Sequence, residues 1–203
     1  MRGCRVRGGT ALDIGAGTGF FTKILADAGY EVTGIDISPT AVAELRKKFP
    51  GLTFIEGRAQ DITGSYDLIT AMAVLFHIVH DADYEEAIRK IYAALKPGGA
   101  FLFSENFPRE TVRHEHIVMH SERELLDILT RAGFTVASRH SFGILMNESI
   151  KGRPTFRWKV LRWILARAPA LGWVIGAILY PFEIIVTLLP YRPSSEIVVC
   201  VKS

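Results

Sequence analysis

Cysteine is scarce in this sequence: its 203 residues include two, Cys4 and Cys200, at opposite ends of the chain. A single distant pair cannot form the disulfide framework of a small secreted protein, and it has no metal-site spacing. The basic start, MRGCRVRGG, has no apolar run behind it, so it is not a signal peptide. These absences favour a reducing compartment, and we expect a cytoplasmic protein.

A strong overall charge is also absent, because the net charge is +3 at pH 7. Six basic residues and no acidic residue lie between 151 and 170, so the positive charge is local: Lys151, Arg153, Arg157, Lys159, Arg162 and Arg167. An anionic partner is therefore expected at this segment and not over the whole surface.

The length and a hydrophobic content of 49% fit one globular domain spanning residues 1–203. Short apolar runs alternate with helical patterns along the chain. We expect strands at 10–15, 31–36, 52–57, 66–73, 100–105, 134–142 and 196–202, and helices at 20–28, from 39 onward, at 83–95 and at 121–132. This alternation predicts an α/β fold in which helices cover both faces of a parallel sheet and ligands bind at the carboxyl ends of its strands.

A glycine-rich turn follows the first expected strand, in ALDIGAGTGFFTKIL. Gly15, Gly17 and Gly19 alternate there, and Asp13 stands just ahead of them. Such a turn lets backbone N–H groups approach a ligand at a helix N-terminus. A P-loop would need Gly-Lys-Ser/Thr at the end of the turn, which Phe20 excludes. The dinucleotide fingerprint would need its third glycine at Phe20, so that fit is imperfect.

The actual spacing, Asp-x-Gly-x-Gly-x-Gly, resembles the first motif of the class I S-adenosylmethionine-dependent methyltransferases that act on small molecules. Other motifs follow in the family's order: an acid after the second strand in GIDIS, AVLFHI after the fourth strand, and LKPGG before the fifth, together spanning residues 10–142. The resemblance implies a Rossmann-like, seven-stranded, mostly parallel sheet. It also implies S-adenosylmethionine as cofactor and S-adenosylhomocysteine as product.

The resemblance assigns these cofactor-binding residues: Asp13, Gly15, Ala16, Gly17, Gly19, Asp36, Ile37, Arg58, Ala59, Gln60, Ala71 and Phe76. Asp36 is expected to bind both ribose hydroxyls, because a carboxylate offers two acceptor oxygens to a vicinal diol. Ile37 is expected to pack on the adenine. Arg58 departs from the family, which has an aspartate there that accepts the adenine amino group. A guanidinium cannot accept a hydrogen bond, so the backbone of Ala59 and the side chain of Gln60 or Asp61 are the alternatives.

Catalytic residues are harder to predict, because a methyl on a sulfonium is already activated and the protein mainly aligns the nucleophile and excludes water. An alcohol acceptor would still need a general base. His77, in the loop after the fourth strand, and Glu105, at the end of the fifth, are the candidates. The structural alternative for His77 is a pocket wall, and the alternative for Glu105 is a supporting partner of other residues. Three histidines in HEHIVMH could suggest a metal, but we expect a solvated or substrate-facing loop there and no metal site.

A long segment separates the last two expected strands, where the family has a short hairpin. We expect a helical insertion at 147–193. Its second half, LGWVIGAILYPFEIIVTLLP, is apolar for about the length of a membrane span. Pro181 and Glu183 near its middle, and the return to the sheet directly after it, argue against a span. A lid over an apolar pocket, replacing the N-terminal helix usual in the family, is one interpretation. Peripheral membrane contact through 151–190 is the second, and a buried helical pair without ligand role is the third.

The sequence therefore predicts methyl transfer from S-adenosylmethionine to a small, largely apolar metabolite, at oxygen. One alternative is a peripheral-membrane methyltransferase of a lipid, quinone or lipid-linked sugar. Other classes remain open: a nicotinamide-dependent oxidoreductase, or a non-catalytic cofactor-binding protein. Nucleic acid is not expected as a partner, because AMAV stands where enzymes that methylate base amino groups have Asn/Asp-Pro-Pro-aromatic. Trp158 and Trp163 in the basic segment do not by themselves make a nucleic-acid module.

Overall fold

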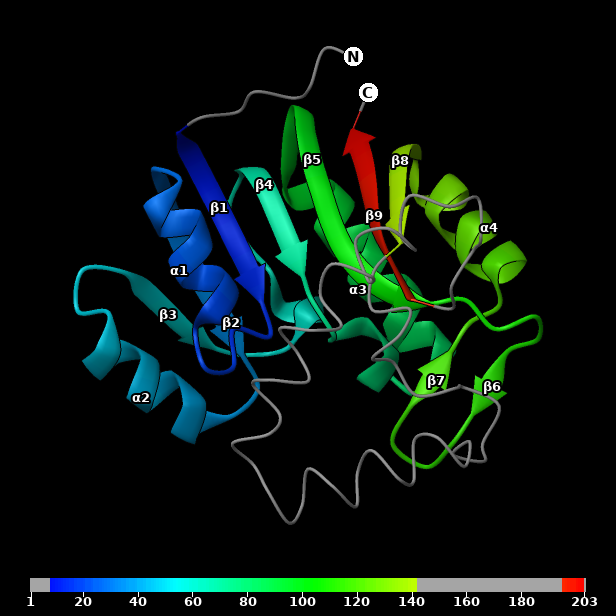
Figure 1. Ribbon diagram of the computed structural model, residues 1–203, viewed down its shortest axis with the longest axis horizontal. Coiled ribbons are helices and arrows are strands. Elements are labelled where there is room, and N and C mark those ends of the chain that lie inside the picture. Colours follow the sequence, from blue (N-terminus) through cyan, green and yellow to red (C-terminus); the bar gives the residue numbers. More distant parts are fainter. Residues whose placement is uncertain (1–7, 142–194, 203) are drawn as a thin grey trace, which may run out of the picture.

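The computed structural model describes residues 8–141 and 195–202. The insertion expected at 147–193, the basic segment within it and Cys4 lie outside the described residues. Seven strands form one sheet (Figure 1): β1 (Gly9–Ile14), β2 (Tyr30–Asp36), β3 (Thr53–Glu56), β4 (Tyr66–Ala71), β5 (Leu95–Asn106), β8 (Phe134–Ser141) and β9 (Ser195–Lys202).

The strand order is β3-β2-β1-β4-β5-β9-β8. The first five strands in this order pair in parallel, and β9 runs antiparallel to both of its neighbours. The expected seven-stranded, mostly parallel sheet is confirmed. Because the order reverses between β1 and β4, a crevice for a ligand is expected where the chain turns away on both sides.

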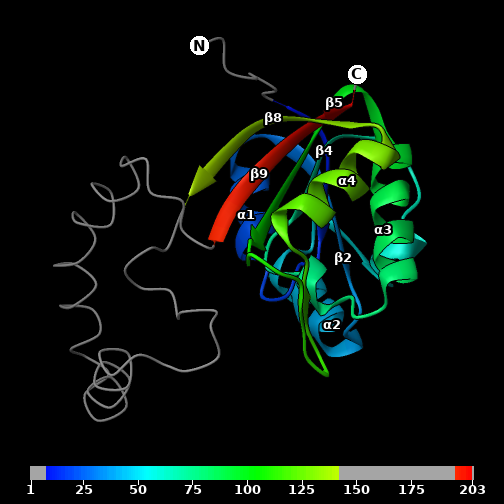
Figure 2. The ribbon, with the colours of Figure 1, turned by 90° about the vertical axis from the view of Figure 1, so that its right-hand side faces the viewer.

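Among the described residues, four α-helices surround the sheet: α1 (Phe20–Asp27), α2 (Pro39–Lys48), α3 (Asp81–Ala94) and α4 (Glu122–Ala132). Figure 2 shows α3 and α4 on one face, with α1 on the other. Two helix starts follow the sequence signals directly. The hydroxyl of Ser38 accepts the N–H of Ala41 at 3.2 Å, with Pro39 at the first helical position, and Ser121 caps α4 in the same way.

The main core lies between the sheet and the α3–α4 layer. Phe101 and Phe103 of β5 are fully buried there against Ile88 and Leu125. Side chains alternate along a strand, so Glu105, two residues after Phe103, points into the same layer. A carboxyl group is thus directed into the apolar core at the carboxyl end of the sheet.

Short elements differ from the expectation. β5 begins at Leu95 and not at 100, because the LKPGG segment continues the pairing with β4 through a register shift. A small hairpin, β6 (Val112–Arg113) and β7 (Val118–Met119), and two 3₁₀ turns, η1 (Ala59–Asp61) and η2 (Leu75–His77), were not expected. Elements of two or three residues are too short to show a periodicity. None of the helices that the structure describes has the length and apolar character needed to cross a bilayer.

Candidate cofactor and acceptor site

The glycine turn between β1 and α1 has a backbone that only glycine adopts easily. Gly15, Gly17 and Gly19 have φ angles of 67°, 53° and 80°, in the left-handed region that L side chains avoid. A Cβ on Gly15 would stand 2.3 Å from a methyl of Val74, and one on Gly19 would stand 2.5 Å from the ring of Phe49. The backbone conformation therefore favours glycine at all three positions, and close packing also requires it at Gly15 and Gly19.

Asp36 ends β2 beside this turn. Its carboxylate accepts the N–H of Gly17 at 2.8 Å on one oxygen and the N–H of Ser38 at 2.9 Å on the other. Each carboxylate oxygen can accept a second hydrogen bond, which leaves acceptor capacity for a diol. The next residue, Ile37, is 71% exposed. A half-exposed carboxylate that can accept from two hydroxyls, with an exposed apolar side chain next to it, fits the ribose and the base of a nucleoside.

Asp13 lies beneath the turn, with only 2% of its surface exposed. The hydroxyl of Thr22 donates to one oxygen at 2.6 Å, and that of Thr70 donates to the other at 2.8 Å. Burial raises the pKa of this carboxyl, and the two hydroxyls oppose the increase. Asp13 thereby ties β1 to α1 and β4 from inside the protein. The side chain of Ala16 is likewise buried, in a small core with Leu45.

The expected adenine side is formed by η1, after β3. Asp61 accepts hydrogen bonds from the backbone N–H of Arg58 at 2.9 Å and from its Nε at 3.2 Å. This pairing with Arg58 lowers the pKa of Asp61. Ala59 is buried in the main core, and Gln60 is half-buried. Gln60 and Asp61 were the two side chains expected to replace the family's aspartate. Asp61 is already engaged by Arg58, which leaves Gln60.

The loop after β4 is strained and closely held. Ala71, the last residue of β4, is fully buried. Ala73 has a φ of 58°, the one positive value among the described non-glycine residues, and its N–H donates to the buried hydroxyl of Ser104 at 2.7 Å. Val74 then packs over Gly15, as the distance above shows. Backbone strain of this kind is concentrated at functional sites, and here it fixes the β4 loop against the cofactor turn.

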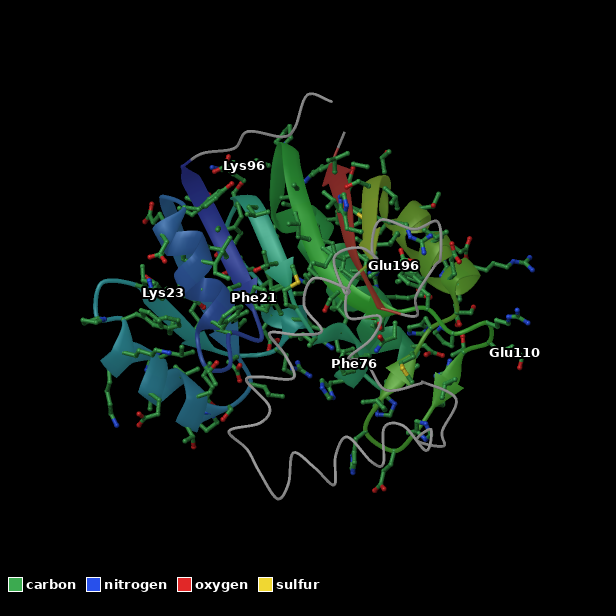
Figure 3. All side chains as sticks on the ribbon, viewed as in Figure 1. Phe21, Lys23, Phe76, Lys96, Glu110 and Glu196 are labelled. Carbon is green, nitrogen blue, oxygen red and sulfur yellow. The ribbon has the colours of Figure 1, made fainter. Side chains whose placement is uncertain are left out.

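His77 and Phe76 come next, in η2. Their rings lie 4.5 Å apart between centroids, and Figure 3 shows Phe76 below the arrowheads of β4 and β5. His77 is exposed, and its Nδ1 lies 3.4 Å from the carbonyl oxygen of His116 in the β6–β7 hairpin. Glu105 is instead 2% exposed, and burial raises its pKa to about 8. The two predicted catalytic residues therefore occupy opposite environments.

The histidines of HEHIVMH do not converge. His114 and His116 are exposed on the hairpin, whereas His120 is fully buried. Within residues 8–141 and 195–202, no three His, Cys, Asp or Glu side chains are grouped as a metal site would need.

Several residues of the site were not identified from the sequence. Thr22, Thr70 and Ser104 hold Asp13 and the β4 loop, and Tyr84 lies buried between Glu105 and the ring of His120. No local motif marks these residues, because each acts through a partner far away in the sequence. Only the alternation of side chains along β5 carried a signal, since it directs Glu105 inward.

The fold and the turn define a class of protein: a Rossmann-like α/β protein that binds a nucleoside-type cofactor at the carboxyl ends of β1 and β2. Comparison with known proteins narrows this class. A family model described as "Methyltransferase domain" matches residues 11–99. Over this stretch the chain is similar to the S-adenosylmethionine-dependent methyltransferases, whose cofactor is S-adenosylmethionine.

Two relatives of known name illustrate the similarity. A demethylmenaquinone methyltransferase of Chlorobaculum tepidum is 29% identical over 139 residues, which cover 68% of this chain and 56% of the relative. A ubiquinone biosynthesis O-methyltransferase of Pseudomonas savastanoi pv. phaseolicola is 34% identical over 105 residues, covering 48% of this chain and 44% of the relative. The chain thus spans about half the length of these two relatives.

Two solved structures share the fold. An S-adenosylmethionine-dependent methyltransferase from Mesorhizobium loti has a TM-score of 0.64 at 20% identity, covering 98% of this chain and 93% of its own. A Burkholderia thailandensis 1,6-didemethyltoxoflavin-N1-methyltransferase, solved with S-adenosylhomocysteine, has a TM-score of 0.63 at 19% identity, covering 97% and 72%. At such identities these likenesses show the fold alone.

Proposed function

We propose that this protein transfers a methyl group from S-adenosylmethionine to a hydroxyl oxygen of a small, largely apolar acceptor. One observation carries the proposal: the glycine turn, the Asp36 carboxylate and the β4 loop lie together at one end of the sheet. Asp36 accepts the N–H of Gly17, and Val74 of the β4 loop packs over Gly15. The names of two relatives, a demethylmenaquinone methyltransferase and a ubiquinone biosynthesis O-methyltransferase, support a quinol-like acceptor.

The cofactor residues divide into two groups. Asp36 binds the ribose hydroxyls, the glycine turn at 15–19 lets the cofactor approach the backbone closely, and Ile37 covers the adenine. Because Asp61 is engaged by Arg58, Gln60 accepts the adenine amino group. Behind these residues Asp13 and the buried Ala71 fix the turn and the strand end, and Phe76 closes the side near the methyl group.

His77 is the proposed general base. S-adenosylmethionine supplies the activated methyl group. The exposed imidazole of His77 takes the proton from the acceptor hydroxyl as the oxygen–carbon bond forms and the carbon–sulfur bond breaks, so that S-adenosylhomocysteine and the methyl ether are the products. Glu105 is an unsuitable base, because only 2% of its surface is exposed and an acceptor hydroxyl cannot reach it; we assign it a supporting role.

The acceptor side involves the insertion predicted at 147–193. The chain leaves the sheet after Ser141 and returns at Ser195, which pairs with Asn106 at the carboxyl end of β5. Both attachment points therefore lie at the end of the sheet where the cofactor binds. Phe20 is 65% exposed and Phe21 is 38% exposed. Both follow the glycine turn directly and add apolar surface there, and Phe21 is labelled in Figure 3. We infer that the insertion lines an apolar pocket of a cytoplasmic enzyme.

Calorimetry with S-adenosylhomocysteine tests the cofactor site. Asp36→Ala is expected to weaken binding by about 1.5–3 kcal/mol, the magnitude of hydrogen bonds to a charged group. Glu56→Ala is the matched control, because Glu56 is an exposed carboxylate that pairs in register with Asp36 on the neighbouring strand. Unchanged affinity in Asp36→Ala would refute the assignment. Binding of NADH without binding of S-adenosylhomocysteine would favour the oxidoreductase alternative.

Methyl transfer to demethylated quinols and catechols, followed by mass spectrometry, tests the reaction. His77→Gln is expected to lower kcat about a hundredfold or more, with unchanged affinity for S-adenosylhomocysteine. His80→Gln, an exposed neighbour, is the control. Near-normal turnover of His77→Gln would make His77 a pocket wall. Salt-sensitive sedimentation with phosphatidylglycerol vesicles would support membrane contact through 151–190, and no sedimentation would oppose it.

A further inference from the structure

A buried polar cluster lies next to the proposed base and has no assigned role. Tyr84 of α3 and His120, which follows β7, are fully buried, and Glu105 at the end of β5 is 2% exposed. The rings of Tyr84 and His120 meet edge to face, 4.4 Å apart between centroids. The hydroxyl of Tyr84 faces the Glu105 carboxyl, but within the described residues that hydroxyl, one Glu105 oxygen and both His120 ring nitrogens make no hydrogen bond of good geometry.

Such a cluster is unfavourable for stability alone. Burying polar atoms without hydrogen-bond partners costs free energy, and apolar side chains of similar size avoid that cost. Local conflicts of this kind occur mostly where function requires them. The cluster therefore needs an explanation outside core packing. Its members come from α3, from β5 and from the end of the β6–β7 hairpin, so the cluster connects the hairpin to the rest of the domain.

The two ends of the β6–β7 hairpin meet on one carboxylate. The hydroxyl of Thr111, just before β6, donates to Oε2 of Glu124 in α4. Nδ1 of His120, just after β7, lies 3.4 Å from the same oxygen. A bidentate pair between Arg113 and Asp81, with both distances 2.8 Å, adds a contact to α3. That pair is exposed and adds little, so the buried side of the hairpin determines its position.

The hairpin in turn contacts the proposed base. The carbonyl oxygen of His116 lies 3.4 Å from Nδ1 of His77. A carbonyl can only accept a hydrogen bond, so in this contact Nδ1 carries the proton. In a neutral imidazole Nε2 then has the lone pair. The position of the hairpin thereby selects the nitrogen of His77 that is able to take a proton from an acceptor.

We propose that His120 and Tyr84 are positioning residues: with Glu124 they hold the β6–β7 hairpin so that its His116 carbonyl keeps His77 in the Nδ1–H tautomer, and Glu105 supports Tyr84 from β5. The inference rests on the proposed role of His77 as base. His120 acts through its contact with Glu124, and the Tyr84 ring fixes the plane of its imidazole. Neither residue touches substrate or cofactor.

Nitrogen-15 NMR of the histidine side chains tests this without any acceptor. His77 is assigned by its absence in His77→Gln, and in the native protein its neutral ring is expected to be protonated at Nδ1. His120→Phe keeps the ring contact with Tyr84 but loses the approach to Glu124, and it is expected to move the His77 proton toward Nε2. His114→Gln, on the exposed part of the same hairpin, is the control and should leave the tautomer unchanged. A native His77 protonated at Nε2, or an unchanged tautomer in His120→Phe, would overturn the inference.

Kinetics give the second readout. His120→Phe is expected to lower kcat at least tenfold, with unchanged affinity for S-adenosylhomocysteine. The double variant with His77→Gln should lose nothing beyond His77→Gln alone, because both changes act through one imidazole; additive losses would contradict this. If His77→Gln itself retains full turnover, the base assignment in the proposed function is wrong, and the catalytic part of the inference falls with it. The NMR result still decides the role of the hairpin. Should His120→Phe not fold, Thr111→Val removes the other contact with Glu124 and should shift the tautomer in the same direction.

Discussion

The buried carboxyl of Glu105 should make the stability of this protein depend on pH in a way that one substitution removes. One of its oxygens accepts the N–H of Asn106 at 3.1 Å, and within the core the carboxyl also faces the Tyr84 hydroxyl. Burial is the largest cause that raises its pKa from 4.5 to about 8. In the unfolded chain the group has its ordinary pKa. Between these two values folding takes up a proton, so the free energy of unfolding falls as the pH rises.

The size of the effect follows from the two pKa values. Each pH unit across the interval changes the free energy of unfolding by about 1.4 kcal/mol. The full interval from 4.5 to about 8 therefore corresponds to at most about 5 kcal/mol. The change between pH 5 and pH 7 alone is about 3 kcal/mol. This is a large part of the stability of a typical domain.

Glu105→Gln keeps the shape of the side chain and removes its titration. Urea denaturation of both proteins at pH 5, 6, 7 and 8 should show that the variant gains stability relative to the native protein with every step. Glu56→Gln, at an exposed position on β3, should follow the native curve. If the Glu105→Gln and native curves stay parallel from pH 5 to pH 8, the carboxyl is not held neutral by burial and the reasoning is refuted.

Three further results are expected. Gly15→Ala should abolish binding of S-adenosylhomocysteine in calorimetry, because its Cβ would stand 2.3 Å from a methyl of the β4 loop at a φ of 67°; Gly51→Ala, where a Cβ meets nothing within 4 Å, should bind normally. Asp67→Asn should lower the free energy of unfolding by about 1 kcal/mol at pH 7. The hydrogen bond from Lys96 is the main cause that lowers the pKa of Asp67 to about 2, so in acid denaturation this difference should disappear as the pH falls from about 4 toward 2. Lys202→Met should lower the free energy of unfolding by about 1–2 kcal/mol, because the Lys202 ammonium donates to three carbonyls at the end of α3, at 2.6 to 3.4 Å; equal stability would contradict that role.

The sequence by itself determined the features that a few neighbouring residues decide. Apolar runs and glycine stops indicated the strands and helices of the sheet. Ser38 with Pro39, and Ser121, marked two helix starts that the structure confirms. The spacing of the three glycines required a turn with left-handed backbone, and all three have a positive φ. Propensity, capping and conformational freedom act within one or two turns of chain, so they can be predicted without knowing which strands pair.

Only the tertiary structure decided how the polar groups of the site are paired. Asp13 accepts from Thr70, 57 positions away, and Asp61 is engaged by Arg58 although the sequence left it as an adenine acceptor. The contact between His77 and the His116 carbonyl depends on a hairpin whose two-residue strands carry no periodic signal. Burial likewise sets the protonation of Glu105, and burial depends on α3 and β5 packing together. The partner and the solvent exposure of an ionisable group are properties of the assembled layers, so a single chain segment cannot specify them.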